Sequence, residues 1–225
     1  MPGRASPCET LSLRRRTRTT HLSALIHRFT KNTTWGTIVK DCEYIHKAPD
    51  SLATWGAMST WSGAVGPVSS SVDTQLLSEL RSDNGAAALE RAYRRHAGSL
   101  VSLVTHCIGA SSLAGQVVED VFVRLWEEPE SFLGSRRSLR SCLAEDAYRR
   151  CEALSAQASG TADGKGNGVP GPWQQLSPLE RVTMGLVRFG EMTSDQVAVL
   201  LDVSPDTVNS TILEGLQRLA RGQPG

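Results

Sequence analysis

Apolar side chains recur at the spacing of an α-helix through the middle of this chain. The longest run keeps to one stripe at intervals of i, i+4, i+7 and i+11: Leu89, Tyr93, His96, Leu100, Val104, Cys107 and Ile108. A repeat of this period lies along one face of a helix, the face that a globular domain buries. The run predicts a long amphipathic helix that ends at Gly109, with His96 packed rather than acting as a ligand or base.

Three further helical segments flank this one in the sequence. A short helix is predicted from Asp73 until Asn84 interrupts it, and another over residues 112–128, where Pro129 stops it. A fourth helix, over about residues 136–154, turns five side chains inward: Leu139, Leu143, Ala147, Cys151 and Leu154. The four segments together predict a compact helical domain over residues 71–158.

Residues 159–173 separate this domain from a second one. Gly and turn-forming residues fill the segment, which therefore cannot bury a core and is expected to be a flexible linker. Residues 174–225 contain three helix-start signals: Ser177-Pro178-Glu180, Thr193 with Gln196, and Ser204-Pro205. A short turn separates the last two helices, which is the layout of a helix-turn-helix. The sequence thus predicts an all-α protein with two small tethered domains.

The first 70 residues have no sustained helical or strand period. They carry 9 basic and 4 acidic side chains, whereas residues 71–158 carry 10 and 12 and residues 159–225 carry 5 and 7. We expect this N-terminal extension to have little stable structure, or translation to begin at Met58. A basic arm that touches DNA is the functional alternative.

Several classes of protein do not fit the sequence. No stretch approaches the roughly 18 apolar residues of a membrane span, and no signal peptide is evident, so we expect a cytoplasmic protein without membrane insertion. The five cysteines form no C-x-x-C pair, and Cys42 with His46 has no second ligand pair nearby. Motifs of a nucleophile elbow or a phosphate-binding loop are also missing. We therefore expect no enzyme activity, no catalytic residues, no metal and no cofactor.

Four stretches resemble the bacterial sigma-70 family of transcription factors, of the extracytoplasmic-function (ECF) type. VVEDVFVRLWEEPESF, residues 117–132, is similar to the segment of sigma region 2 that binds core polymerase, and LLSELRSDNGAAALERAYRRHAGSLVSLV to the helices before it. SLRSCLAEDAYRRC is similar to the segment that melts and reads the −10 element. LSPLERVTMGLVRFGEMTSDQVAVLLDVSPDTVNSTI is similar to sigma region 4, the helix-turn-helix that reads the −35 element. The resemblance covers nearly all of residues 73–221 and implies a region 2 helical bundle followed by a region 4 domain.

The resemblance implies a polymerase-binding surface on the third predicted helix. Val118, Phe122 and Trp126 share an apolar face that Asp120 borders. Asp120, Phe122 and Trp126 would meet the coiled coil of the largest polymerase subunit, and tryptophan is a favoured interface anchor. The alternative is that this face fills the domain core, the better interpretation for Val121 and Leu125.

The resemblance also implies two DNA-binding surfaces. Arginines at both ends of the fourth helix would contact the separating −10 strands: Arg136, Arg137, Arg140, Arg149 and Arg150. A merely solvated face is the alternative, and Glu145 and Asp146 lie between the two groups. Residues around the start of the last helix would read the −35 element: Ser204, Asp206, Thr207, Asn209, Ser210 and Thr211. The family has basic residues where this chain has Asn209, Thr211 and Glu214, so this domain either contacts DNA weakly or binds protein instead.

These features predict a dissociable sigma factor that binds core RNA polymerase and promoter DNA and directs transcription initiation. An anti-sigma factor is a further partner implied by the resemblance. The alternative is a sigma-like interaction protein that keeps the fold but has lost promoter reading.

Overall fold

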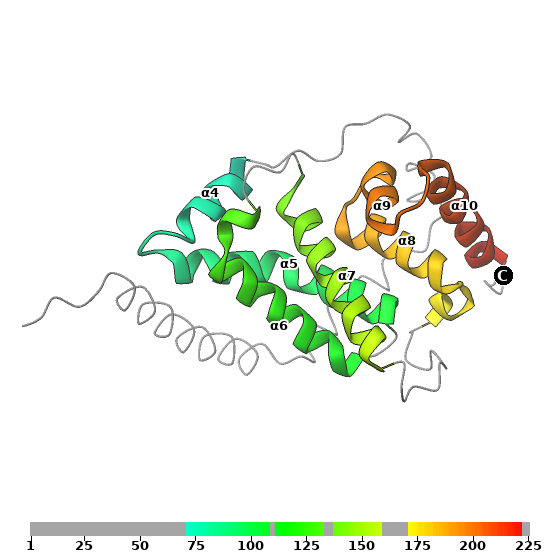
Figure 1. Ribbon diagram of the computed structural model, residues 1–225, viewed down its shortest axis with the longest axis horizontal. Coiled ribbons are helices and arrows are strands. Elements are labelled where there is room, and N and C mark those ends of the chain that lie inside the picture. Colours follow the sequence, from blue (N-terminus) through cyan, green and yellow to red (C-terminus); the bar gives the residue numbers. More distant parts are fainter. Residues whose placement is uncertain (1–70, 109–110, 133–136, 159–170, 222–225) are drawn as a thin grey trace, which may run out of the picture. The chain divides into compact units, whose positions relative to one another are not determined.

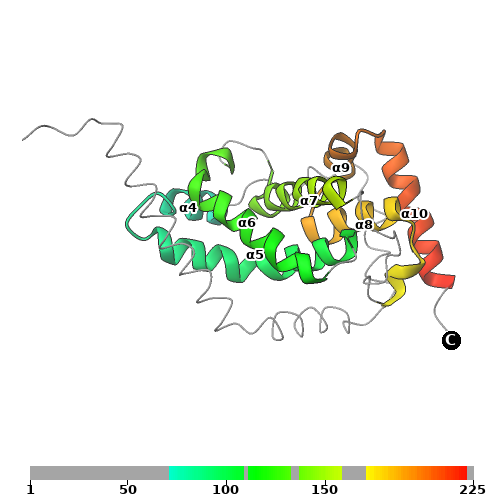
Figure 2. The same cartoon turned by 60° about the horizontal axis from the view of Figure 1, so that its bottom comes forward.

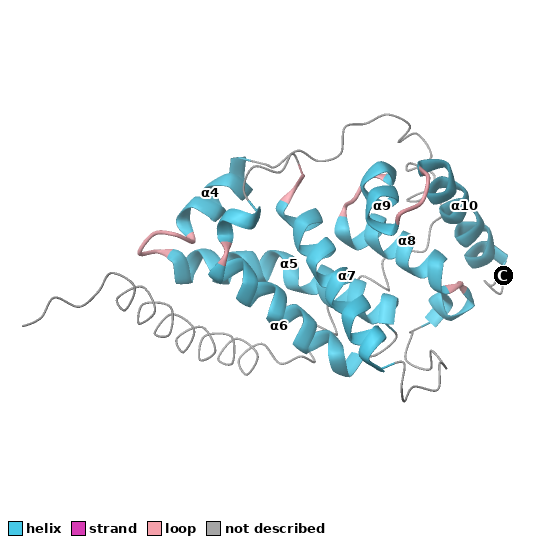
Figure 3. Ribbon diagram, viewed as in Figure 1, coloured by secondary structure: helices cyan, strands magenta, loops and turns pink. Residues whose placement is uncertain are grey.

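The computed structural model describes residues 71–108, 111–132, 137–158 and 171–221. Every regular element in these ranges is a helix and none is a strand (Figure 3), which confirms the all-α class. The N-terminal extension, Arg136 and most of the predicted linker lie outside the described residues. None of the helices in the described ranges is long and apolar enough to cross a bilayer.

The first group of helices forms around one long helix. Its elements are α4 (Ser71–Glu79), α5 (Gly85–Ile108), α6 (Ser111–Glu127), the 3-10 helix η1 (Pro129–Phe132) and α7 (Leu139–Ala158). Helix α5 packs against α4, α6 and α7. Most members of the predicted stripes are buried, and Leu100, Phe122, Leu125, Leu139 and Leu143 are fully enclosed, whereas Leu154 is only half-buried. His96 is also inside, with 2% of its surface exposed.

The second group of helices is the predicted helix-turn-helix and the helix before it. Its elements are η2 (Gly171–Gln175), α8 (Pro178–Gly190), α9 (Ser194–Leu201) and α10 (Pro205–Arg221). Both predicted capping boxes are present, Ser177 with Glu180 and Thr193 with Gln196. The turn after α9 places Asp202 in the left-handed region, with φ 55° and ψ 48°. Aspartate tolerates this conformation better than most residues, so the turn forms without glycine.

Helix α8 joins the two groups. It packs against α5 and α7 on one side and against α9 and α10 on the other (Figures 1 and 2). All the described helices belong to one compact unit. The boundaries that the sequence suggests between two domains and their linker stay a prediction.

Candidate polymerase and nucleic-acid interface

The apolar face predicted to bind polymerase on α6 divides into a buried part and an accessible part. Val118 and Phe122 are completely buried, and the Phe122 ring packs on Tyr93 with 4.9 Å between centroids. Trp126 is half-buried, and the Asp120 side chain is 50% exposed. Val118 and Phe122 thus support α6 from within, Asp120 lies at its surface, and Trp126 is partly accessible there.

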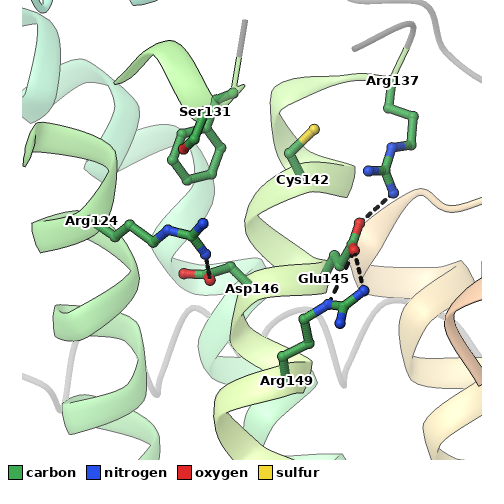
Figure 4. A pocket seen from close by; sticks show the side chains of 8 residues that line it. Arg124, Ser131, Arg137, Cys142, Glu145, Asp146 and Arg149 are labelled. Carbon is green, nitrogen blue, oxygen red and sulfur yellow. Dashed lines mark hydrogen bonds and ion pairs between the residues drawn. The ribbon is translucent and has the colours of Figure 1, made fainter. Parts of the chain in front are cut away.

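Three arginines lie around a pocket between α6, η1 and α7: Arg124 of α6, Arg137 just before α7, and Arg149 of α7. The pocket has a volume of about 360 Å³ and is lined by eight residues: Arg124, Ser131, Phe132, Arg137, Cys142, Glu145, Asp146 and Arg149. Figure 4 shows the Glu145 carboxylate between Arg137 and Arg149, and Arg124 pointing to Asp146. With three arginines and two acids the lining has one excess positive charge, so it is only weakly cationic.

Glu145 and Asp146 hold the pocket arginines in place. Glu145 accepts hydrogen bonds from Arg137 and, at 2.9 Å, from Arg149. Burial would raise the pKa of Glu145, but the hydrogen bonds from Arg149 and Arg137 outweigh it, so this pKa lies below its ordinary value. Asp146, which is 6% exposed, accepts from Arg124 and, at 3.1 Å, from Arg150. The sequence placed these acids among the arginines, and the structure shows them as their partners.

The predicted polymerase surface and the predicted −10 surface adjoin. Nη1 of Arg150 on α7 lies 3.8 Å from Oδ2 of Asp120 on α6. Two segments that the sequence singled out for different partners therefore meet at one edge of the helical bundle. Arg140, at the start of α7, lies apart from this edge and forms an ion pair with Glu191.

Most of the predicted −35 residues are engaged within α9 and α10. The Ser204 hydroxyl caps α10 by accepting from the Thr207 amide at 3.1 Å, and Ser210 donates to the Thr207 carbonyl at 3.0 Å. The Ser194 hydroxyl donates to Asn209 at 2.7 Å. Thr211 is buried, with 8% of its surface exposed. The remaining predicted residue, Asp206, is exposed and acidic.

The helix-turn-helix carries no positive charge from Met192 to Gln217. Residues 192–217 contain no Lys, Arg or His, but they contain four carboxylates: Asp195, Asp202, Asp206 and Glu214. All four are exposed. The two cations of the helix-turn-helix, Arg218 and Arg221, stand in the last turn of α10, where Arg218 donates to the buried Glu180 at 2.8 Å and Arg221 donates to the Gln217 carbonyl at 3.2 Å. DNA binding draws most of its affinity from phosphate contacts with Lys and Arg, so this surface offers DNA few of them.

The described thiols and acids form no reactive or metal-binding group. Cys151 is buried, which raises the pKa of its thiol to about 12, and Cys142 is half-buried. In the ranges that the structure covers, no three His, Cys, Asp or Glu side chains gather in a way that could hold a metal ion. Cys42 and His46 lie outside those ranges.

Several solved structures resemble this chain, among them the following two. One is CnrH in complex with the cytosolic domain of CnrY, with 18% identity over 67% of this chain and 96% of that one and a TM-score of 0.49. The other is the sigma factor RpoE in complex with the anti-sigma factor NepR from Bartonella quintana, with 14% identity over 59% of this chain and 94% of that one and a TM-score of 0.46. No protein-family model matches the chain, and no curated protein does.

Proposed function

We propose that this chain is a sigma factor that binds core RNA polymerase in the cytoplasm and directs promoter-specific transcription initiation. Asp120 and Trp126 on α6 would bind polymerase, with Val118 and Phe122 shaping that surface from inside. Arg137, together with Arg136, Arg140, Arg149 and Arg150, would bind the separated −10 strands. Following the sequence resemblance, an anti-sigma factor is the proposed regulatory partner.

The observation that carries this proposal is the meeting of α6 and α7 at Asp120 and Arg150, 3.8 Å apart. A factor that opens promoter DNA on the polymerase must present its polymerase contact and its strand contact side by side. The arginines next to this edge can contact phosphates while keeping their carboxylate partners, because a guanidinium has five N–H donors. Their existing ion pairs fix their positions in advance.

A binding experiment tests the polymerase half of the proposal. Asp120→Arg reverses the charge of an exposed side chain and should weaken binding of the full chain to bacterial core polymerase at least about tenfold, the cost of a repulsive contact in an interface. Asp83→Arg, in the exposed turn between α4 and α5, makes the same charge change outside the predicted polymerase-binding surface, and this variant should bind polymerase as tightly as the wild type. If both variants bind polymerase with equal affinity, Asp120 on α6 is not part of the polymerase interface.

A transcription experiment tests the promoter half. The chain is mixed with core polymerase and genomic DNA fragments, and transcript starts are mapped by sequencing. Specific starts that share upstream elements are expected from a working sigma factor. Polymerase binding without specific starts would contradict promoter reading.

The acidic surface of the helix-turn-helix between Met192 and Gln217 favours a second candidate function, a sigma-like module that binds polymerase or a regulatory protein without reading promoters. Besides its four carboxylates, this surface exposes apolar side chains: Val199 on α9 is 84% exposed and Leu213 on α10 is 57% exposed. Exposed apolar groups among polar ones suit a protein partner better than DNA. In this case the exposed residues among those predicted to read the −35 element, Ser204, Asp206, Thr207, Asn209 and Ser210, would contact protein, with the buried Thr211 supporting them from inside.

A further inference from the structure

Helix α9 has one side that no other part of the described chain covers. Asp195 and Val199 lie one turn apart on this side, Asp202 follows where the helix ends, and all three are exposed. Val199 has 84% of its surface exposed, which is high for a β-branched apolar side chain. Val197 and Ala198 are buried instead, so α9 packs on its neighbours through a different side.

Helix α10 leaves a similar side uncovered. Asp206, Leu213 and Glu214 lie on it at i, i+7 and i+8, and all three are exposed, Leu213 by 57%. Gly215 faces the opposite way: a Cβ atom there would lie 2.5 Å from a methionine sulfur of α8, whereas one on Gly98 of α5 would have no neighbour within 4 Å. Helix α10 is thus pressed on α8 through one side and is open on the other.

The uncovered sides of α9 and α10 adjoin. The two helices pack against each other (Figure 1), and the Ser194 hydroxyl at the start of α9 donates to the Asn209 side-chain oxygen of α10 at 2.7 Å. Asp195 follows Ser194 directly, and Leu213 lies one turn after Asn209 on α10. We call the joint surface the acidic face and define it by six residues: Asp195, Val199, Asp202, Asp206, Leu213 and Glu214.

The acidic face carries four carboxylates and no basic residue. Every ion pair of the described residues lies outside this face. Bringing unpaired carboxylates into an interface costs desolvation free energy, which only a partner with positive charges offsets. A second copy of the same face, or a DNA phosphate, would add like charges instead. The charge of this surface therefore selects a cationic partner.

The two apolar side chains narrow the class of partner further. Val199 and Leu213 stand on different helices, and carboxylates precede and follow each of them in the sequence. Apolar residues inside a charged rim are the arrangement of a protein interface. A helix with an apolar stripe flanked by lysines and arginines has the complementary pattern, and binding of such amphipathic helices to the surface of a folded domain is a recurrent mode of recognition.

We propose that the acidic face binds a cationic amphipathic helix of a partner protein. Val199 and Leu213 receive the apolar stripe of that helix, and the four carboxylates pair with its lysines and arginines. The inference rests on the second candidate function, which gives the helix-turn-helix a protein partner, and it adds the chemistry of that partner. Opposite charges on the two surfaces also speed association, and they make it sensitive to salt.

The test uses two synthetic peptides as probes of the full chain. The first is a fluorescein-labelled helical peptide of about 18 residues made of Leu, Lys and Ala, with leucines along one side and lysines beside them. The second has the same composition in scrambled order, so it keeps the charge but has no apolar stripe. Fluorescence anisotropy measures the affinity of each peptide at several salt concentrations. The ordered peptide should bind at least about fivefold more tightly than the scrambled one.

A first double variant tests the apolar contacts. Val199→Ser with Leu213→Ser replaces two exposed side chains, so the fold is kept, as far-ultraviolet circular dichroism can verify. Affinity for the ordered peptide should fall about tenfold, because two side chains no longer bury apolar surface in the complex. Affinity for the scrambled peptide should change little.

A second double variant tests the charges. Asp206→Asn with Glu214→Gln should weaken binding of the ordered peptide at least about fivefold at low salt and flatten its salt dependence. Asp83→Asn with Glu127→Gln is the matched control, because it removes two exposed carboxylates outside the acidic face. The control should bind the peptide as tightly as the wild type.

The proposal is overturned if neither peptide binds, or if the scrambled peptide binds as tightly as the ordered one. It is also overturned if the control weakens binding as much as Asp206→Asn with Glu214→Gln, because net charge alone would then hold the peptide, or if Val199→Ser with Leu213→Ser has no effect. Polymerase binding through Asp120, measured on the same preparations, is a separate result. A chain that binds polymerase but not the peptide contradicts only this inference, and a chain that binds the peptide but not polymerase contradicts only the sigma-factor proposal.

Discussion

The buried His96 should make the stability of this protein depend strongly on pH. Its ring lies inside the bundle of α4, α5 and α7, and neither ring nitrogen has a hydrogen-bond partner among the described residues. The pKa of His96 is lowered from 6.5 to about 4, mainly by burial; the positive charges of Arg140 and Arg95 contribute to this, and the nearby Asp73 opposes it. The folded protein therefore keeps His96 neutral.

The size of the effect follows from this pKa. An unfolded chain takes up a proton on His96 below about pH 6.5, whereas the folded chain does so only below about pH 4. The stabilising contribution of the neutral ring is fully present above pH 6.5 and is lost as the pH falls from 6.5 towards 4. Between pH 7 and pH 5 this linkage lowers the free energy of unfolding by about 2 kcal/mol.

Other shifted groups act in a different pH range. Glu145 and Glu180 have lowered pKa values, so the stability that they contribute is present above their ordinary pKa and is lost only as the pH falls through their folded values. That loss begins near pH 4.5, which is below the interval from pH 7 to pH 5 in which His96 lowers the free energy of unfolding. The two kinds of group can therefore be separated by titration.

The assay is urea unfolding followed by far-ultraviolet circular dichroism at pH 7, 6 and 5. His96→Leu replaces a buried ring without hydrogen bonds by an apolar side chain of similar size, so it should fold at pH 7 with at least wild-type stability. Between pH 7 and pH 5 the free energy of unfolding of both proteins should decrease, but the decrease should be about 2 kcal/mol smaller for His96→Leu than for the wild type. Parallel curves for the two proteins would refute a buried neutral His96.

Three further substitutions have defined outcomes. Glu214→Arg on the exposed face of α10 should tighten binding to double-stranded DNA and steepen its salt slope by about 0.9; an unchanged slope would place Glu214 away from DNA. Glu180→Ala removes the buried acceptor shared by the start of α8 and Arg218, and should lower the free energy of unfolding by about 2 kcal/mol in urea denaturation. Gly215→Ala places a Cβ 2.5 Å from a methionine sulfur of α8 and should cost about 1 kcal/mol relative to Gly98→Ala, as measured by the same denaturation; equal stabilities would disprove the close approach of α10.

Local sequence signals predicted the helices because each signal acts over a few residues. The capping boxes at Ser177 and Thr193 and the stop after Ile108 involve groups within about one turn of each other. The contact of α8 with α5 and α7 had no such signal. It depends on Gly190 meeting Ala144 and on Trp173 meeting His106, and these pairs are 46 and 67 residues apart in the sequence.

The candidate site was predictable by residue type but not by role. Periodicity put Val118, Asp120, Phe122 and Trp126 on α6, but it could not separate the members that fill the core from those at the surface. It also placed Glu145 beside the arginines of α7 without revealing that it pairs with two of them. The i, i+4 spacing of Glu145 and Arg149 is a signal for one of these pairs.

The internal ion pairs of α7 bear on how any sigma-like activity must work. Each described arginine of the predicted −10 surface, namely Arg137, Arg140, Arg149 and Arg150, already has a carboxylate partner in the chain. A phosphate adds to these pairs or competes with them, so it gains less than it would from an unpaired guanidinium, and the helix-turn-helix has cations only in the last turn of α10, at Arg218 and Arg221. The isolated chain should therefore bind single-stranded DNA with a salt slope of only about −0.7 to −1.4, equivalent to one or two phosphate contacts. A polymerase partner would then have to supply most of the affinity for DNA, while α7 contributes arginines in fixed positions. A salt slope much steeper than this for the isolated chain would contradict this division of roles.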